Sequence, residues 1–372
     1  MVGPLSGIRI IDLTTVIAGP YATQMLGDMG AEVIKIEPPV GDIMRAPGPA
    51  RSPGMGAAFL NCNRNKDSIC LDLKNSNDLS RLVDLIAEAD VFIHNMRMNA
   101  ARRLALDPEA LNKRFPRLVY CAITGFGQDG PYRDRPAYDD IIQAISGWAA
   151  LSSDPDEPPR YAPTIVADKT AGLHAVSAIT AALLHRERTG QGQAIEVPMF
   201  EVMVSFLAVE HLAGKSFLPA EGPSGYNRLL NPWRRPYRAA DGFIAVMPYT
   251  AAHWKSFFTA AGRADWADDP ILIDDGQRAA SVGQLYKRLS ECVVHKTVAE
   301  WAELLGKLDI PFSPVNRLDE LEGDPHVQAT DLFQKVDHPT EGKMLVVRPP
   351  VRFSHTPCSI RRLAPSLERS VR

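Results

Sequence analysis

The sequence predicts an α/β protein built on a parallel sheet. Short apolar runs alternate with amphipathic helical patterns over roughly the first third of the chain, which is typical of strand–helix–strand units. The composition is that of a globular protein, with 45% hydrophobic and 23% charged residues. The length, 372 residues, exceeds that of one ordinary domain, so we expect either two domains or one large one.

The strands and helices of this first region follow from local patterns. Apolar runs predict strands at 9–13, 31–36, 68–73, 90–94 and 118–123. Residues 20–29 are expected to form a helix that ends at Gly30. Leu79, Leu82, Val83 and Ile86 have the spacing of one helix face, and Asn77 is expected to cap that helix. A parallel sheet covered on both faces places ligands at the carboxyl ends of its strands.

The rest of the chain is predicted to contain one long helix and, near residue 220, a change in composition that marks a linker. Residues 168–186 form an alanine-rich helical pattern that ends before Gly190, followed by a strand at 194–197 and a helix at 199–212. A Pro/Gly-rich stretch near residue 220 predicts a linker, giving a large domain of residues 1–224 and 331–372 and a small domain of 225–330. Further expected elements are a strand at 242–247, helical stretches around 252–261 and 281–305, and strands at 344–347 and 351–353.

The net charge and the cysteines exclude several classes of partner and site. The net charge of −3 provides no basic field for nucleic acid or an anionic membrane, so neither is expected as a partner. Five widely spaced cysteines without a CxxC pair indicate a reducing compartment and no zinc knuckle. The sequence has no signal-peptide pattern and no apolar run of about 18 residues, so a cytoplasmic protein is expected.

Common catalytic motifs are missing from the sequence. The segment after the first strand, Thr14 to Pro20, has no GxGxxG, and the chain has no GxxxxGK[ST], HExxH or GxSxG. These absences weigh against nicotinamide, nucleoside triphosphate and zinc chemistry, and no metal site is expected.

One carboxylate is well placed for chemistry. Asp168 stands at the start of the alanine-rich helix, after an apolar triplet. Its position favours a helix cap, since Asp is a preferred cap residue. The alternative is a nucleophile: a helix N-terminus stabilises an anion by about 0.3–1 kcal/mol, which is expected to keep the carboxylate ionised and able to attack an activated acyl group.

Several basic and polar residues follow predicted strand ends. Each one alone fits a solvated surface, but together they offer the point charges and forked donors that bind phosphate groups. They are Lys74, Asn95, Arg97, Arg102, Arg103 and Tyr138.

Long ordered motifs then resemble the class III CoA-transferases, the group that includes formyl-CoA transferases, carnitine CoA-transferases and 2-methylacyl-CoA racemases. They include LSGIRIIDLT from Leu5, AGPYATQMLGDMGAEVIKIEPP from Ala18, NRNK from Asn63, TGFGQDGP from Thr124, Ala137-Tyr138-Asp139, and HRERTGQGQAIEV from His185. The likeness covers nearly the whole chain.

The resemblance implies a Rossmann-like large domain, a smaller α/β domain and an interlocked homodimer. It also implies a CoA-transferase that moves CoA from an acyl-CoA to a free carboxylic acid through a covalent intermediate on Asp168, with acyl-CoA as substrate and no tightly bound cofactor. By motif matching, the residues that contact CoA are Ile17, Leu71, Lys74, Asn95, Arg103 and Tyr138.

The sequence differs from formyl-CoA transferases at two places, and two alternative functions stay open. Formyl-CoA transferases carry Gln at the position of Ile17 and a glycine run near residues 231–235, so oxalate and formyl specificity are not expected here. A racemase needs two acid–base groups, and in that branch His occupies the position of Tyr138, whose reference pKa of about 10 suits a proton relay poorly. A CoA-binding protein without turnover would have no use for Asp168.

Overall fold

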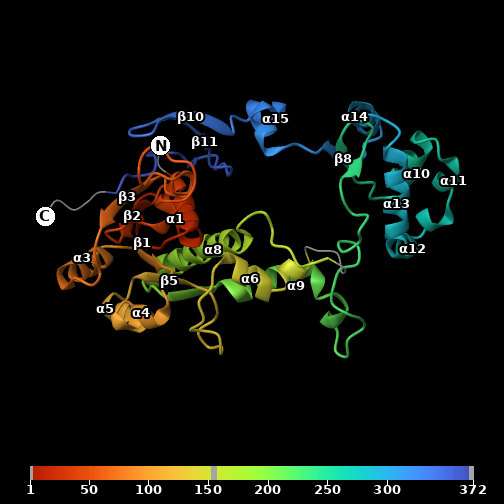
Figure 1. The fold of residues 1–372 in the computed structure, drawn as a ribbon. Helices are drawn as coiled ribbons and strands as arrows, with labels where there is room; N and C mark the ends of the chain where they lie inside the picture. The colour runs from red at the N-terminus through yellow and green to blue at the C-terminus, as the bar shows by residue number, and fades with distance from the viewer. Residues whose placement is uncertain (1–2, 152–156, 368–372) are drawn as a thin grey trace. The chain divides into compact units, whose positions relative to one another are not determined.

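The computed structural model describes residues 3–151 and 157–367. These residues form two compact units: the first contains residues 3–151, 159–207 and 326–367, the second residues 157–158 and 208–325 (Figure 1). Among the described residues no helix is long and apolar enough to cross a membrane. All five cysteines are free thiols.

A six-stranded parallel sheet forms the centre of the first unit, which confirms the predicted α/β class. Its strands are β1 (Arg9–Leu13), β2 (Glu32–Glu37), β3 (Lys66–Cys70), β4 (Val91–His94), β5 (Val119–Thr124) and β6 (Ala194–Pro198). They are arranged in the order β3-β2-β1-β4-β5-β6. This is the doubly wound order, in which the chain changes direction between β1 and β4, and such switch points open a crevice at the carboxyl ends of the strands.

Helices cover both faces of this sheet. Those of the first unit are α1 (Ala18–Asp28), α2 (Ala57–Cys62), α3 (Ser76–Ala87), α4 (Met98–Arg103), α5 (Pro108–Arg114), α6 (Asp139–Ile145), α7 (Trp148–Leu151), α8 (Val166–Thr189), α15 (Pro325–Ala329) and most of α9 (Met199–His211). Short 3-10 turns lie at η1 (Ile43–Arg45) and, in the second unit, at η2 (Ala213–Ser216), η3 (Pro270–Leu272) and η4 (Leu318–Gly323). The cap of α3 is Asn75 rather than the predicted Asn77, because the Asn75 side chain accepts from the N–H groups of Asn77 and Asp78.

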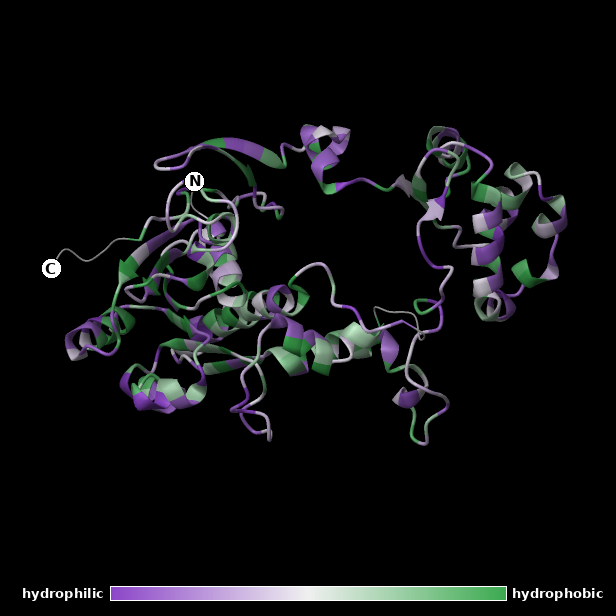
Figure 2. Ribbon diagram, viewed as in Figure 1, coloured by the Kyte–Doolittle hydropathy of each residue, from purple (hydrophilic) through white to green (hydrophobic). Residues whose placement is uncertain are grey.

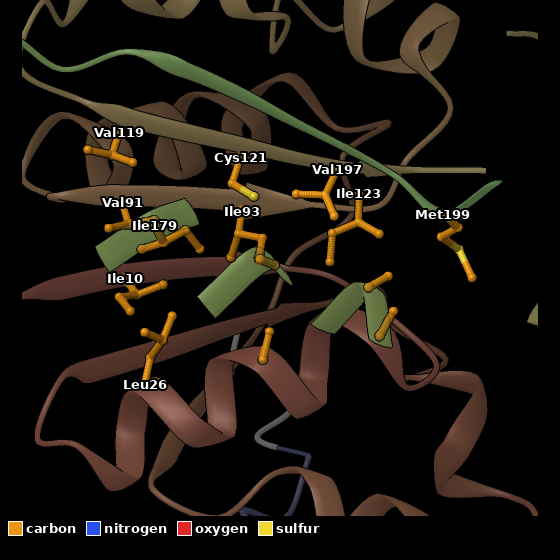
Figure 3. Close-up of a cluster of buried hydrophobic side chains, with 14 of the residues drawn as sticks. Ile10, Leu26, Val91, Ile93, Val119, Cys121, Ile123, Ile179, Val197 and Met199 are labelled. Carbon is orange, nitrogen blue, oxygen red and sulfur yellow. The ribbon is translucent and has the colours of Figure 1, made fainter. Parts of the chain in front are cut away.

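The two faces of the sheet bury separate apolar clusters. On one face, strand residues pack against α1 and α8, as Figure 3 shows for Ile10, Ile93 and Ile123 with Leu26 and Ile179. On the other face, Ile11, Phe92 and Tyr120 pack with residues of α3, α4 and α5. Because both faces are covered, the strands bury apolar side chains on both sides, most completely in β4 and β5. Other strands also contain charged residues such as Lys35 and Glu37 of β2, and in Figure 2 the ribbon of this unit carries both green, hydrophobic, and purple, hydrophilic, segments. The sheet is therefore a rigid base for loops at its carboxyl edge.

The second unit has its own core. A three-stranded antiparallel sheet of β7 (Tyr237–Arg238), β8 (Phe243–Val246) and β9 (Phe312–Pro314) belongs to it. Its helices are α10 (Ala251–Ala260), α11 (Ala264–Ala267), α12 (Asp275–Ala280), α13 (Val282–Val293) and α14 (Val298–Lys307). The predicted helical stretch 281–305 is thus two helices, separated where Thr297 starts α14 with a capping box. Aromatic side chains fill this core, with Phe257 stacked on Trp301.

Near the C-terminus the strand predictions were partly wrong. An antiparallel hairpin joins β10 (Phe333–His338) to β11 (Gly342–Val347) in the first unit. β11 includes the predicted strand 344–347, whereas β10 was missed. Residues 351–353, predicted as a strand, form no regular element because prolines at 349 and 350 precede them and proline cannot donate to a ladder.

Candidate active site

A pocket lies at the carboxyl edge of the sheet, beside the switch point between β1 and β4. Its lining includes Thr15 and Val16 after β1, Asn95 and Met96 after β4, and Ile123 and Thr124 at the end of β5. Asp168 of α8 and Tyr138, which precedes α6, complete its wall. All of these residues belong to the first unit. This is the crevice in which a doubly wound sheet binds its ligands.

Asp168 reaches this pocket from the first turn of α8. The helix begins at Val166, so Asp168 is its third residue, and the cap position is Ile165, which makes no side-chain cap hydrogen bond. The expectation that Asp168 caps the helix is therefore wrong. Its side chain lines the pocket although the residue is only 7% exposed. Burial without a capping role removes the simplest structural explanation for this carboxylate.

Close packing of α8 against α1 brings Asp168 to the strand ends. A Cβ atom added at Gly172 would lie 2.8 Å from the carbonyl oxygen of Ala18, far inside a normal contact. Ala18 itself lines the pocket. The small residues that the sequence shows along α8 therefore allow the two helices to approach, and this approach sets the position of Asp168 one turn earlier.

The charge of Asp168 is unfavourable in this environment. Burial, and then the negative charge of Asp139, raise the pKa of Asp168 to about 7. We had expected the N-terminus of α8 to keep this group ionised, but a dipole effect of about 0.3–1 kcal/mol is smaller than the roughly 4 kcal/mol that such a shift represents. At neutral pH the carboxyl group therefore exists both protonated and ionised.

Asp139 and Gln143 hold the start of α8 in place. One carboxylate oxygen of Asp139 accepts the backbone N–H of Asp168 at 3.0 Å, and the other accepts from Gln143 Nε2 at 2.5 Å. Gln143 Oε1 in turn accepts the N–H of Ala162 at 2.8 Å. Neither residue was predicted from the sequence, although Asp139 directly follows Tyr138 in the motif Ala137-Tyr138-Asp139.

This pair predicts a specific pH dependence. Asp168 is the nucleophile that the family resemblance predicts, and a carboxylate attacks only when it is ionised. We therefore expect kcat/KM for acyl-CoA to fall as the pH drops below about 7, the pKa of Asp168. Replacing Asp139 by Asn keeps a hydrogen-bond acceptor but removes the negative charge, so the pKa of Asp168 should fall and the acid limb should move to lower pH. An acid limb that stays in place in Asp139→Asn would contradict the proposed coupling, and Asp140→Asn, an exposed neighbour, is the control.

Some of the residues predicted to contact CoA line this pocket, and others do not. Asn95 and Tyr138 line the pocket, as does Arg97. Ile17 and Leu71 are buried beside strand ends, whereas Lys74, Arg102 and Arg103 are exposed and do not line this pocket. Arg133 and Arg135 do line it and were missed, because they lie in a loop after the TGFGQDGP motif rather than at a strand end. The roles of these residues in binding CoA stay predictions.

Comparisons with known proteins agree with this architecture. A model of CoA-transferase family III matches residues 5–370. Succinate–glutarate CoA-transferase of Agrobacterium fabrum is 36% identical, over 98% of this chain and 93% of that protein. Human succinyl-CoA:glutarate CoA-transferase is 32% identical, over 98% of this chain and 83% of that protein. A CAIB/BAIF family protein from Brucella suis has a crystal structure that covers 99% of this chain and 97% of its own, with a TM-score of 0.83 and 31% identity. This chain therefore belongs to CoA-transferase family III.

Proposed function

We propose that this CoA-transferase exchanges CoA between dicarboxylic acids, with Asp168 as the nucleophile. The observation that supports the nucleophile is the state of its carboxylate: it is buried, it lines the pocket, and none of the described residues donates a hydrogen bond to its oxygens. A carboxylate that accepts no hydrogen bonds from the protein is a stronger nucleophile than one stabilised by several donors, because no such bonds must be broken before attack.

The proposed reaction balances on this one group. An oxygen of Asp168 attacks the thioester carbonyl and the carbon–sulfur bond breaks. CoA leaves the acyl carbon as a thiolate, and a mixed anhydride between the acyl group and Asp168 remains. The thiolate then attacks the aspartyl carbonyl and releases the donor acid as a free carboxylate. The acceptor acid attacks this enzyme–CoA thioester, and the same steps in reverse give the new acyl-CoA and the free Asp168 carboxylate.

Arginine side chains at the pocket are suited to the phosphate groups of CoA. Arg97, Arg133 and Arg135 line it, and all three are exposed in this chain. The guanidinium of Arg135 is held over the ring of Tyr132 at 3.8 Å from the centroid. A guanidinium that is already oriented loses little freedom when it binds a phosphate.

Removing one of these charges should weaken binding without changing the chemistry. We expect Arg135→Ala to raise KM for acyl-CoA by about tenfold or more, the usual effect of a charge-assisted hydrogen bond, with kcat unchanged. The matched control is Arg114→Ala, since Arg114 also lies over a neighbouring ring, Phe115, but does not line the pocket. A short pantetheine thioester should show no difference between Arg135→Ala and wild type. An equal loss with both thioesters would contradict the phosphate role.

Dicarboxylic acids are proposed as the substrates for two reasons. The names of similar proteins specify succinate, glutarate and mesaconate. In addition, Arg234 and Arg235 line a pocket of the second unit whose lining contains no carboxylate among the described residues. A positive pocket of this kind favours an acid with a second carboxylate.

A panel of acyl-CoA donors and acceptor acids tests the proposed substrates. Glutarate and succinate should be preferred over butyrate and other monocarboxylic acids, and a preference for monocarboxylic acids would contradict the proposal. The same assay in D₂O, with a chiral 2-methylacyl-CoA and no acceptor, should give no deuterium at the α-carbon. Deuterium incorporation would favour the racemase instead.

We further propose that the protein works as a homodimer in a reducing compartment, the cytoplasm. Large apolar side chains remain exposed on the helices of the single chain: Leu173 and Leu184 on α8, and Val204 and Phe206 on α9, are 40–52% exposed. Apolar surface of this extent on neighbouring helices is typical of subunit interfaces. The five free thiols support the compartment.

A further inference from the structure

The turn after β1, residues Thr14 to Val16, has every backbone N–H bonded to a side chain. The N–H of Thr14 donates to Asp12 Oδ1 at 2.9 Å, that of Thr15 to Asn95 Oδ1 at 3.0 Å, and that of Val16 to Asp42 Oδ1 at 3.2 Å. Two carbonyls are also occupied: Lys35 Nζ donates to the oxygen of Thr14 at 2.7 Å and Asn95 Nδ2 to that of Thr15 at 2.8 Å. The conformation of the turn is therefore imposed by side chains.

Val16 makes such restraint necessary. Its φ angle is +70°, in the left-handed region that a β-branched residue rarely adopts. A backbone of this kind persists only where the surroundings over-determine it, and it is concentrated at functional sites. Val16 lines the pocket, so its conformation shapes the wall beside Asp168.

Asp42 is the residue that restrains Val16, and it is itself fixed by a buried charge network. Its other oxygen lies 2.8 Å from Lys35 Nζ, and both side chains are completely buried. The N–H of Asp42 donates to Glu37 Oε2 at 2.8 Å, and Glu37 is held by Arg45 through two hydrogen bonds of 2.6–2.7 Å. Because each partner is buried and paired, Asp42 has little freedom to move away from Val16.

This arrangement differs from the glycine-rich turn of dinucleotide-binding folds. There, the free N–H groups of the turn after the first strand approach a pyrophosphate. Here, the N–H groups of Thr14 and Val16 already donate to the carboxylates of Asp12 and Asp42, so they are not free to bind a phosphate. The turn is thus a preformed wall, and recognition of the phosphates is left to cationic side chains.

We propose that Asp42 is a positioning residue for acyl-CoA: it acts through Val16 to hold the wall against which the thioester binds. This inference rests on the proposed function, since it assumes that acyl-CoA occupies the pocket of Asp168. Asp42 contacts no substrate in this proposal, so its loss should weaken binding of acyl-CoA more than it slows the chemical steps.

The test compares Asp42→Asn with Asp28→Asn in the full-length protein. Asp28 is the matched control, because it is also a buried carboxylate paired with a cation. It accepts from Arg64 at 2.7–2.9 Å and from Asn65 Nδ2, but it does not line the pocket. Both substitutions should lower the melting temperature, because each leaves a buried cation unpaired. Asn keeps the oxygen that accepts from Val16 but loses the ion pair with Lys35 that fixes this side chain. Only Asp42→Asn should therefore raise KM for acyl-CoA, by about tenfold, with kcat within about twofold of wild type.

A double-mutant cycle with Val16→Gly tests the route of the effect. If Asp42 acts through Val16, the combined variant should raise KM no further than the larger of the two single substitutions. Additive effects on KM, or an equal rise in KM for Asp28→Asn, would overturn the proposal. Should Asp42→Asn fail to fold, Asp42→Ser, which keeps an oxygen at the start of η1, carries the same expectation. A failure of the proposed function can be told apart from a failure of this proposal. If the proposed function is wrong, Asp168→Ala retains CoA transfer, whatever the KM measured for Asp42→Asn.

Discussion

Asp168→Ala is expected to reduce CoA transfer by roughly a thousandfold or more, the scale on which enzymes lose activity without their nucleophile. The affinity for CoA should stay within about threefold of wild type, since the proposed phosphate contacts are made by Arg97, Arg133 and Arg135. Initial rates with succinyl-CoA and glutarate, together with calorimetric titration of CoA, measure the two quantities separately.

The same substitution should raise stability above neutral pH. The pKa of Asp168 is raised in the folded protein from its usual 3.8 to about 7, so the folded state binds this proton more tightly than the unfolded state does. The stabilisation by the proton is complete below about pH 4 and is lost as the pH rises through 7, where an ionised carboxylate remains buried at a cost of about 4 kcal/mol. Asp168→Ala removes that cost, and its melting temperature at pH 8 should exceed that of wild type.

Asp140→Ala provides the control for both measurements. Asp140 is exposed and lies two residues after Tyr138, so it carries a nearby carboxylate without entering the pocket. We expect wild-type transfer and wild-type stability for this variant. Transfer retained by Asp168→Ala would remove the nucleophile from the mechanism, and a lower melting temperature at pH 8 would show that its charge is not strained in the folded state.

Gly172→Val is expected to have the second largest effect, on both folding and activity. Its new Cβ would lie 2.8 Å from the backbone oxygen of Ala18 and close to the ring of Tyr21, neither of which can rotate away easily. The strain should lower the free energy of unfolding by about 1–3 kcal/mol, the usual cost of overpacking. Because α8 carries Asp168, moving it away from α1 should also reduce kcat by about a hundredfold, the effect of a misplacement of about 1 Å.

Ser177→Val on the same helix is the control for the low helix propensity of valine, which Gly172→Val would also introduce. Ser177 is exposed on α8, so its replacement introduces the same β-branched residue without a contact to α1. Chemical denaturation should show little change for this variant, and its kcat should equal that of wild type. Equal losses in the two variants would mean that the close approach at Gly172 has no special role.

The sequence predicted the central sheet well because buried parallel strands are continuous apolar runs. The predictions at 9–13, 90–94 and 118–123 lie within one residue of β1, β4 and β5. At 68–73 the prediction was shifted, because β3 begins at Lys66, a buried lysine whose ammonium group is neutralised by Asp12 at 3.1 Å. A pattern of hydrophobic residues cannot reveal a strand position that is occupied by a paired charge.

The site was predicted less completely, for a physical reason. Asp168 could be found from the start of its helix and from the family resemblance. Its raised pKa, however, comes first from burial in the folded chain and then from the charge of Asp139, which lies 29 positions earlier in the sequence. The restraint of Val16 by Asp42 likewise joins two loops that no local pattern connects. Contacts between distant loops decide the electrostatics of the pocket, and only the folded chain shows them.

The most direct test of the central claim is to trap the covalent intermediate. The protein is incubated with succinyl-CoA, quenched with hydroxylamine or borohydride, digested and analysed by mass spectrometry. We expect a modification on the peptide that contains Asp168, absent when succinyl-CoA is omitted and absent in Asp168→Ala. A modification on another residue, or transfer that proceeds at the full rate while no adduct ever forms on this peptide, would contradict it.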